Sequence, residues 1–466
     1  MRVLLVMPPN WGVEMPPLGI AYISAALKRA GHEVKVLDYN LKVFQRVKER
    51  LPLAWAMSSF SEWIDRAAYD EKFGPRIEPI LAEVVDEVRA YRPQAVGFTV
   101  LATSIFPVEF MSKQIRTAMP EVKLFYGGPN VRDHYQEAVM QTPWVDATIS
   151  GEGEDATCDL IQFWEKGGEP VLASVQHRLP DGQIIVGPLR QQMKLENLPF
   201  PDFSDFPIKE YSSPALPFSM SRGCVKRCTF CSEAPFWRNY RTRSADAIFQ
   251  EVKYNVERYG IRNFLSHDSL MNGNFEVLSD FVDKVIAADL KINWQGMARL
   301  DNRMTPDLLK RMNKAGCNYI SYGLESGSQK MVDLMRKGFK VDDALRIIKD
   351  TYAAGIKANV FIIVGFPKES WLDYLKTMWF LFQIRKCIFL ANVSDAGIMA
   401  GSPLAAQQEH FGILRGVNFA GEWRTKFFMN TKYHRRFKLW LMRVFIKRLR
   451  VMENKLISPL DNIYEW

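Results

Sequence analysis

The sequence is poor in cysteine and histidine, with only six of each among 466 residues. No cysteine precedes Cys158, and half of the six are scattered singly along the chain. So sparse a set excludes the disulfide framework on which small secreted proteins depend. We therefore expect free thiols in a reducing cytoplasm, and the scattered Cys158, Cys317 and Cys387 are interpreted as small buried hydrophobes.

Long apolar runs are missing as well. A membrane-spanning helix needs about 18 uninterrupted apolar residues, and the nearest candidate, 378–393, is broken by Gln383, Arg385 and Lys386. No secretory leader is indicated, because Met1 and Arg2 run directly into a short apolar segment and two prolines. With 47% hydrophobic and 24% charged residues, the chain is predicted to be a soluble cytoplasmic protein of two or three domains.

Three of the cysteines lie together, as Cys224, Cys228 and Cys231 in a C-x3-C-x2-C spacing. This spacing can place three thiolates on three corners of an iron-sulfur cubane, whereas clusters that only carry electrons usually have four cysteine ligands. The fourth iron would then be free to bind another molecule. Structural zinc normally takes four ligands in two pairs, and no second pair lies nearby. The spacing therefore favours a 4Fe-4S cluster over zinc, and zinc over a disulfide.

The first 150 residues alternate short apolar segments with amphipathic ones, which predicts a doubly wound, Rossmann-like parallel sheet. A helix is expected at 18–30, ended by Gly31, and a long insertion with a helix at its end covers 41–92. The expected strands are 2–7, 33–37, 95–99, 122–126 and 147–150.

Ligands of such sheets bind outside the carboxyl ends of the strands. The loops at those ends are rich in glycine, which permits close approach of the backbone to a flat ligand. Ordinary turns explain these glycines equally well on pattern alone. The candidate binding residues in the loops are Pro9, Thr99, Ser104, Gly127, Gly128, Gly151 and Glu152.

A proline-rich stretch predicts an inter-domain linker at 166–212, after which strands and helices alternate again. Six βα units are what a partial (β/α)6 TIM-like barrel requires, and its site should lie at the strand carboxyl ends. The cysteine loop follows the first of these strands directly. The expected strands are 217–221, 263–267, 292–297, 319–324, 358–365 and 388–393.

The cysteine spacing at the start of such a barrel resembles the radical S-adenosylmethionine (SAM) enzymes. That resemblance implies a 4Fe-4S cluster whose open iron binds the amino and carboxylate groups of SAM, and one-electron cleavage of SAM to a 5'-deoxyadenosyl radical. It also implies SAM-binding roles for residues that match family motifs at later strand ends. These are Phe230 before the last cysteine, Arg299, Glu325 and Ser326 in Tyr-Gly-Leu-Glu-Ser-Gly, and Gly365 and Phe366.

Each of these residues has a structural alternative. Phe230 alone would more often be a core aromatic, Gly365 and Phe366 alone a strand-ending turn, and Glu325 alone a solvated strand end. Arg299 is expected either to meet the SAM carboxylate or to pair with an acid. His267 and Asp268, at the end of the second barrel strand, are candidate substrate residues, although a structural histidine is the commoner role. No general base is indicated.

The amino-terminal third resembles the cobalamin-binding domain of the cobalamin-dependent radical SAM family. The similarity covers about the first 160 residues and rests on Met7-Pro8-Pro9, on the segment 16–22, on Gly127-Gly128-Pro129 and on the segment 151–154. Many cobalamin domains carry Asp-x-His-x-x-Gly, whose histidine ligates cobalt, and this chain has no such motif. The resemblance thus implies cobalamin bound without a histidine ligand from the protein.

The resemblance implies domains at 1–165 for cobalamin, 213–400 for the radical SAM barrel and 401–466 for a basic helical region. Methylation of an unactivated carbon in a small-molecule or lipid-like substrate is the expected reaction, with flavodoxin or ferredoxin as electron donor. Cyclisation or rearrangement is the alternative, and a non-enzymatic iron-sulfur sensor is the second one. A tRNA methylthiolase is disfavoured, because that group carries a second cysteine trio ahead of the barrel.

The net charge of +9 is modest but uneven, since no acid occurs between Lys432 and Met452. Basic residues alternate there with large apolar ones, which predicts a basic amphipathic helix. Such a helix can make peripheral contact with an anionic membrane or can lie as a lid whose apolar face covers the barrel. Both interpretations stay open, whereas nucleic-acid binding is not expected.

Overall fold

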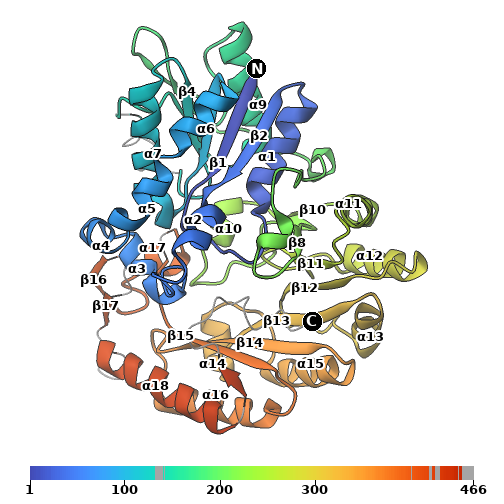
Figure 1. Cartoon of the computed structure of the whole chain (residues 1–466). Helices are drawn as coiled ribbons and strands as arrows, with labels where there is room; N and C mark the ends of the chain where they lie inside the picture. Colours follow the sequence, from blue (N-terminus) through green and yellow to red (C-terminus); the bar gives the residue numbers. More distant parts are fainter. Residues whose placement is uncertain are drawn as a thin grey trace. The chain divides into compact units, whose positions relative to one another are not determined.

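The computed structural model describes residues 1–131, 140, 142–399, 401–418, 422–425, 431–449 and 451–453. It separates into two compact units, of which unit 1 comprises Met1–Pro214 and unit 2 begins at Ala215 (Figure 1). Among the described residues, no helix combines the length and the apolar character that crossing a membrane demands.

Unit 1 is built on a seven-stranded sheet in the order β2-β1-β3-β4-β5-β6-β7. The first five strands are parallel, while β6 and β7 are added antiparallel at one edge. This confirms the predicted parallel sheet, whose strands match their expected positions to within a residue. The strands are β1 Arg2–Met7, β2 Glu33–Asp38, β3 Ala95–Thr99, β4 Lys123–Gly127, β5 Ala147–Ile149, β6 Val175–Arg178 and β7 Ile184–Val186.

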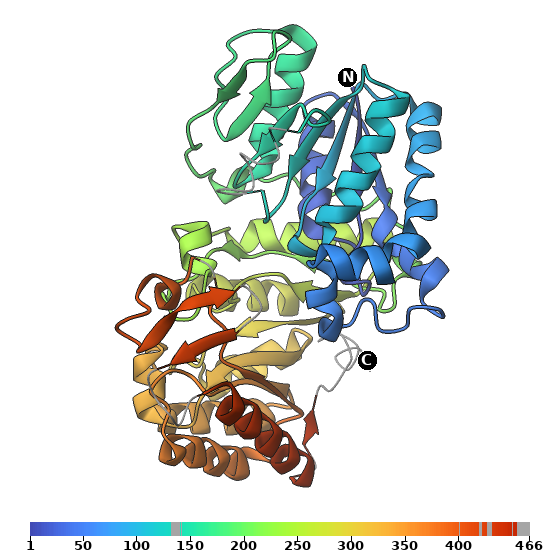
Figure 2. The same ribbon diagram turned by 90° about the vertical axis from the view of Figure 1, so that its left-hand side faces the viewer.

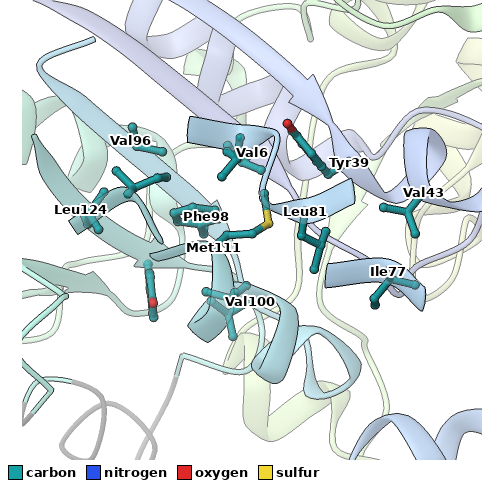
Figure 3. Packing of buried hydrophobic residues seen from close by; sticks show 14 of the residues in the cluster. Val6, Tyr39, Val43, Ile77, Leu81, Val96, Phe98, Val100, Met111 and Leu124 are labelled. Atoms are coloured by element: carbon teal, nitrogen blue, oxygen red, sulfur yellow. The ribbon is translucent and has the colours of Figure 1, made fainter. Parts of the chain in front are cut away.

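Helices flank this sheet, and the long insertion between β2 and β3 is itself largely helical. Its apolar residues pack with those of the sheet into one buried cluster, in which Val6, Phe98 and Leu124 of the strands approach Ile77 and Leu81 of the insertion (Figure 3). The helices of unit 1 are α1 Leu18–Arg29, α2 Tyr39–Val47, η1 Met57–Ser59, α3 Phe60–Trp63, α4 Arg66–Lys72, α5 Gly74–Leu81, α6 Val84–Tyr91, η2 Ala102–Ser104, α7 Ile105–Ala118, α9 Gly153–Lys166, η3 Leu195–Asn197 and η4 Ile208–Glu210.

The segment 166–212 was expected to be a linker only. It contains the hairpin of β6 and β7, which pairs with β5 through His177 and Gln176 and so completes the sheet. The hairpin turn at Asp181-Gly182 is a recognisable signal, since Gly182 takes a positive φ of 88°. Prolines before and after the hairpin obscured it.

Unit 2 contains a second seven-stranded sheet, in the order β18-β15-β14-β13-β12-β11-β8, with every neighbouring pair parallel. Six of its strands are the six predicted barrel strands, so the alternating βα pattern is confirmed. The seventh, β18, was not predicted. The strands are β8 Leu216–Phe218, β11 Asn263–Ser266, β12 Asn293–Ala298, β13 Cys317–Glu325, β14 Lys357–Val364, β15 Leu390–Asp395 and β18 Met452–Glu453.

Helices follow these strands and lie on the outer side of the curved sheet (Figure 2). The unit also contains two small antiparallel strand pairs. These are β9 Ser221–Arg222 with β10 Arg241–Thr242, and β16 Ile413–Asn418 with β17 Glu422–Thr425. The helices are α10 Glu233–Trp237, α11 Ala245–Tyr259, α12 Phe275–Ala287, α13 Pro306–Lys314, α14 Gln329–Leu334, α15 Val341–Ala353, α16 Trp371–Ile384, α17 Pro403–Ala406 and α18 Lys432–Arg448.

Candidate functional site

The cysteine loop leaves the sheet of unit 2 just beyond β8 and is fixed by backbone contacts. Gly223 has a φ of +87°, and a Cβ there would lie 2.6 Å from the backbone oxygen of Asn239, so only glycine fits. The N–H of Thr229 donates to the carbonyl of Met335 at 3.1 Å, and the N–H of Leu404 donates to the carbonyl of Thr229 at 2.7 Å. The loop is therefore held at the carboxyl edge of the sheet.

Within this loop the three thiols are partly buried and close enough to influence one another. Burial raises the pKa of Cys224 and Cys228 and raises that of Cys231 to about 11, and neighbouring thiols add to the rise for Cys224 and Cys231. The backbone N–H of Lys226 donates to Cys224 Sγ at 3.5 Å, and that of Glu233 donates to Cys231 Sγ at 3.4 Å. Such N–H···S contacts stabilise sulfur that carries negative charge, as it does on iron.

Two cations beside the loop act in the same direction. Lys337 and Arg299 both lower the pKa of the Cys224 and Cys228 thiols against the effect of burial. Across the described residues, no three His, Cys, Asp or Glu side chains converge to hold a single metal ion. A cubane places each thiolate on a different iron, so convergence of the thiols on one point is not what it requires.

Glu325, Lys337 and Phe230 form a group at the end of β13. Glu325 is 7% exposed, and its Oε1 lies 3.1 Å from Lys337 Nζ. The Lys337 ammonium also sits 5.6 Å from the centre of the Phe230 ring. Glu325 adopts φ +62°, which turns the chain at the strand end. A buried carboxylate, an ammonium group and an aromatic ring thus lie against the cysteine loop.

Lys337 is the residue that sequence reasoning missed. It follows α14 in the segment Met335-Arg336-Lys337-Gly338 and reaches back toward β13. The lysine pairs with Glu325 in this structure, so a ligand that uses the Glu325 carboxylate must share it with the ammonium group. A lone cation after a short helix carries no recognisable spacing, which is why the sequence did not single it out.

Arg299 stands just beyond β12 and contacts both an acid and the backbone. One guanidinium nitrogen lies 3.4 Å from Asp301 Oδ2, and another donates to the carbonyl of Gly338 at 3.5 Å. Both alternatives raised by the sequence keep support, because the buried Nε of Arg299 has no hydrogen-bond acceptor among the described residues. An unsatisfied buried donor is costly, and a carboxylate ligand would satisfy this one.

The side chains at three of the predicted SAM-binding positions, Ser326, Gly365 and Phe366, do not face a ligand. The Ser326 hydroxyl is buried and bonded to Thr377 Oγ1 at 2.9 Å, so it holds the turn after β13. Phe366 is completely buried in an apolar cluster with Met331 and Phe411. Only backbone atoms of these three positions could meet a ligand.

The backbone at Gly365 is itself organised by the C-terminal helix. The Gly365 N–H donates to Glu369 Oε2 at 2.9 Å, and Lys438 Nζ of α18 lies 2.8 Å from the same oxygen. Both side chains of this ion pair are nearly inaccessible, at 0% and 2% exposed. A Cβ on Gly365, whose φ is +71°, would approach Arg435 Cγ to 2.5 Å. The inner face of α18 therefore fixes the loop after β14.

Asp268 is not available to a substrate, contrary to expectation. Its carboxylate is buried and accepts hydrogen bonds from the N–H of Met220 at 3.0 Å and from the hydroxyl of Ser221 at 2.7 Å. The Ser221 N–H and the Ser266 hydroxyl complete the set. These hydrogen bonds hold the start of the cysteine loop against the end of β11. His267 beside Asp268 is exposed, and its backbone N–H donates to the carbonyl of Phe218 at 2.8 Å.

The candidate loops of unit 1 present backbone more than side chains. Ser104 is buried and its Oγ accepts the Leu101 N–H at 2.8 Å, while Glu152 precedes α9 and its Oε2 accepts the Met193 N–H at 3.4 Å. Gly127 and Gly151, by contrast, have open space where a Cβ would stand. Pro9 is buried and Thr99 half-buried, at the ends of β1 and β3.

Gly128 is the most constrained of these glycines. Its φ is +109°, and a Cβ would lie 2.8 Å from the carbonyl oxygen of Val100 and 2.9 Å from its nitrogen. The Val100 N–H donates to the Gly127 carbonyl at 2.7 Å, which ties the loops after β3 and β4 together.

Comparison with known proteins gives matches to both units. A family model described as the radical SAM superfamily matches residues 218–381, and one described as a B12 binding domain matches residues 10–161. The chain is 24% identical to an uncharacterized methyltransferase of Pyrococcus horikoshii, over 79% of this chain and 75% of that protein. It is likewise 24% identical to the anaerobic magnesium-protoporphyrin IX monomethyl ester cyclase of Rubrivivax gelatinosus, over 62% of this chain and 54% of that enzyme.

Among solved structures, the cobalamin-dependent SAM radical enzyme OxsB with aqua-cobalamin bound superposes with a TM-score of 0.73 at 15% identity. The match covers 95% of this chain and 67% of OxsB. At this identity the likeness concerns the fold. The chain spans between about half and three quarters of the length of these relatives.

Proposed function

Because the chain belongs to the cobalamin-dependent radical SAM enzymes, we propose that it methylates an unactivated carbon of a small-molecule or lipid-like substrate. The observation that carries the proposal is the cysteine loop of unit 2, against which Glu325, Lys337 and Arg299 are gathered. When bound, the cluster, SAM and cobalamin supply one-electron cleavage of SAM and a carried methyl group.

The thiols of Cys224, Cys228 and Cys231 are the proposed ligands of three irons. Lys337 and Arg299 would offset the negative charge of the thiolates and of the cluster. This electrostatic role follows from position, because both cations lower the thiol pKa against the effect of burial.

The SAM-binding roles rest on donors and acceptors that the protein leaves available. Arg299 offers its buried Nε to a carboxylate, and the amino acid part of SAM carries one. Glu325 offers a buried carboxylate to ribose hydroxyls or to an amino group, beside the Lys337 ammonium group 3.1 Å away. Phe230 supplies an apolar surface beside both. The backbone of Gly365 and Phe366 is the proposed contact of the adenine ring.

In unit 1 we propose that cobalamin lies on the edge formed by Pro9, Thr99, Gly127, Gly128 and Gly151. The open space beside Gly127 and Gly151 supports this, since a corrin must approach the backbone closely. Ser104 and Glu152 act indirectly, by fixing the loops that carry these contacts.

The proposed partners follow from the chemistry. The cluster needs one electron at a time from a small carrier such as flavodoxin or ferredoxin. A peripheral membrane contact of the C-terminal region belongs to the same proposal, and its substrate would then be a lipid-like molecule. The three cysteines cannot themselves supply the electron that each turnover consumes.

A radical cyclase is the second candidate, because the chain is similar to a cyclase as well as to methyltransferases. The co-products separate the two. Methylation consumes two SAM molecules, one cleaved to methionine and 5'-deoxyadenosine and one converted to S-adenosylhomocysteine when its methyl group leaves. Cyclisation needs only the cleavage.

The test uses full-length protein reconstituted anaerobically with iron, sulfide and cobalamin, and SAM carrying a deuterated methyl group. We expect 5'-deoxyadenosine and S-adenosylhomocysteine in about equal amounts, with label in a product when cell extract supplies the substrate. Label found only in methionine would favour the cyclase. Absence of both adenosyl products, with a cluster present, would favour the non-enzymatic sensor.

A further inference from the structure

The outward face of α16 carries large apolar residues along its whole length, with Lys376 as the one exposed charge among its residues. Its exposed apolar residues are Leu372, Leu375, Trp379 and Phe382, at 63%, 54%, 62% and 37% exposed. Their spacing of three and four residues puts them on one stripe of the helix. A surface helix normally turns such a stripe toward a core. Here the inward face is separately filled by Tyr374, Phe380, Leu381 and Ile384.

The neighbouring helix α18 buries two of its cations and exposes three of its aromatic residues. Arg435 and Lys438 point inward with Met442 and Ile446, whereas Tyr433, Phe437 and Trp440 are 82%, 50% and 58% exposed. The expectation of a lid that covers the barrel with its large apolar residues is therefore wrong for Phe437 and Trp440. Their spacing again defines one stripe.

The two stripes adjoin. The helices α16 and α18 lie side by side at the lower end of unit 2 (Figure 1). The ring of Trp371, at the start of α16, is 6.2 Å from that of Phe437, and Phe437 is stacked on Trp440 at 5.8 Å. We call the seven exposed residues the aromatic surface: Leu372, Leu375, Trp379, Phe382, Tyr433, Phe437 and Trp440.

The charged residues exposed on these two helices are all positive. The helix α16 contains one acid, Asp373, which is buried against Ser328 and Lys330. The helix α18 contains none. Lys376, Arg436, Lys447 and Arg448 are exposed on them. Large aromatic side chains flanked by lysine and arginine are characteristic of segments that lie in the headgroup region of a membrane.

We propose that the aromatic surface docks on an anionic lipid bilayer, with α16 and α18 lying in the plane of the membrane interface. At 14 and 17 residues these helices are about 21 and 26 Å long, and neither can span a bilayer. Binding would combine burial of the apolar stripes with attraction of the cations to acidic headgroups. This deepens the peripheral contact proposed above by naming its surface and its lipid class.

Two other occupants fit the same surface less well. A second copy of the chain, packed symmetrically, would bring the cations of each surface against those of the other. Single-stranded nucleic acid would stack on Trp379 and Trp440, but Leu372 and Leu375 offer bases no stacking platform. Lipid alone uses the leucines, the aromatic rings and the cations together.

The experiment is co-sedimentation of the full-length protein with vesicles of phosphatidylcholine, with and without phosphatidylglycerol. We expect binding to the anionic vesicles that is at least about tenfold stronger than to neutral ones, and weaker at high salt. The variant Leu375→Ser/Trp379→Ser/Trp440→Ser should lose at least about tenfold in affinity for anionic vesicles. These residues are exposed, so the fold should survive.

The matched control is Met57→Ser/Val171→Ser/Leu189→Ser, which removes three residues of unit 1 that are 70%, 57% and 55% exposed. It should bind like the wild type. Equal sedimentation of the aromatic-surface variant and the wild type would overturn the proposal. A contrary result would be a concentration-dependent dimer, or a shift of RNA in a gel, that the wild type and the control variant show and the aromatic-surface variant does not. Either result would overturn the lipid proposal in favour of a second copy of the chain or of nucleic acid. Sedimentation needs no turnover, so failure of docking and failure of SAM cleavage are distinguishable.

Discussion

The two units place their candidate sites at the same kind of sheet edge but equip them in opposite ways. In unit 2 the strand ends carry buried charges that are already matched: Glu325 with Lys337, and Glu369 with Lys438. In unit 1 the strand ends carry glycines with open space beside them and hydroxyl groups turned into their own loops.

The difference matches what each edge is proposed to bind. A sulfonium cofactor and an anionic cluster are small and charged, so their position must be fixed by groups whose own charge is compensated in a low dielectric. A corrin is large and flat, and shape fixes it better than charge. We therefore predict that the edge of unit 2 loses its ligands when a charge is removed, and that the edge of unit 1 loses its ligand when a methyl group is added.

The sharpest way to separate the two edges is Cys228→Ala. We expect it to lower 5'-deoxyadenosine formation by at least about 1000-fold, because a cluster with two protein ligands is not retained. Cobalamin binding by unit 1 should stay unchanged in the visible spectrum. The control is Cys387→Ala, which removes a partly exposed cysteine outside the loop and should keep full iron content.

The buried pair behind Gly365 tests whether charge organises unit 2 beyond the cysteine loop. Lys438→Met leaves the Glu369 carboxylate buried without its cation, which should reduce the free energy of unfolding by about 3–5 kcal/mol. Urea denaturation measures this. Lys438→Met/Glu369→Gln should recover part of the loss, because it removes both charges. A single variant as stable as the wild type would contradict the assignment.

Lys337→Met removes the cation shared by Glu325 and the cysteine loop. We expect about 100-fold slower SAM cleavage, a loss of about 2.7 kcal/mol, with a smaller decrease in iron content. Lys337→Arg keeps the charge and should recover most of the rate. If Lys337→Met changed only the melting temperature, and not the KM for SAM, Lys337 would be a structural residue.

Gly128→Ala is the corresponding test of unit 1. The added Cβ meets backbone atoms of Val100 that cannot rotate away, so we expect a cost of about 1–3 kcal/mol and weaker cobalamin retention. Gly31→Ala is the matched control, since Gly31 has a similar φ of +88° but open space. Iron content and SAM binding by unit 2 should not change. Equal effects of the two variants would mean that strain alone is responsible.

The strands of both sheets were predictable because buried parallel strands read as short apolar runs between turn residues. The positions of Cys224, Glu325 and Gly365 at strand ends followed directly from that alternation. What the sequence could not give was the partner of each charge. Lys337 lies 12 positions after Glu325 and Lys438 lies 69 after Glu369, and both pairs form only when the helices fold back.

Two errors have a common physical cause. Asp268 was a candidate substrate residue, yet its carboxylate already accepts hydrogen bonds from serine hydroxyls and backbone N–H groups. In one of the two interpretations of the C-terminal helix its apolar residues cover the barrel, yet the helix buries Arg435 and Lys438 and leaves Phe437 and Trp440 exposed. In each case a buried partner outweighs the ordinary preference of the side chain, and partners distant in sequence leave no periodic signal.

The most direct measurement of the central claim is iron, sulfide and cobalamin content of anaerobically purified wild-type protein, followed by SAM cleavage in the same sample. The account predicts about four irons and four sulfides per chain, bound cobalamin, and 5'-deoxyadenosine on reduction with dithionite. Protein that holds cobalamin but assembles no cluster on Cys224, Cys228 and Cys231, and leaves SAM intact, would contradict it.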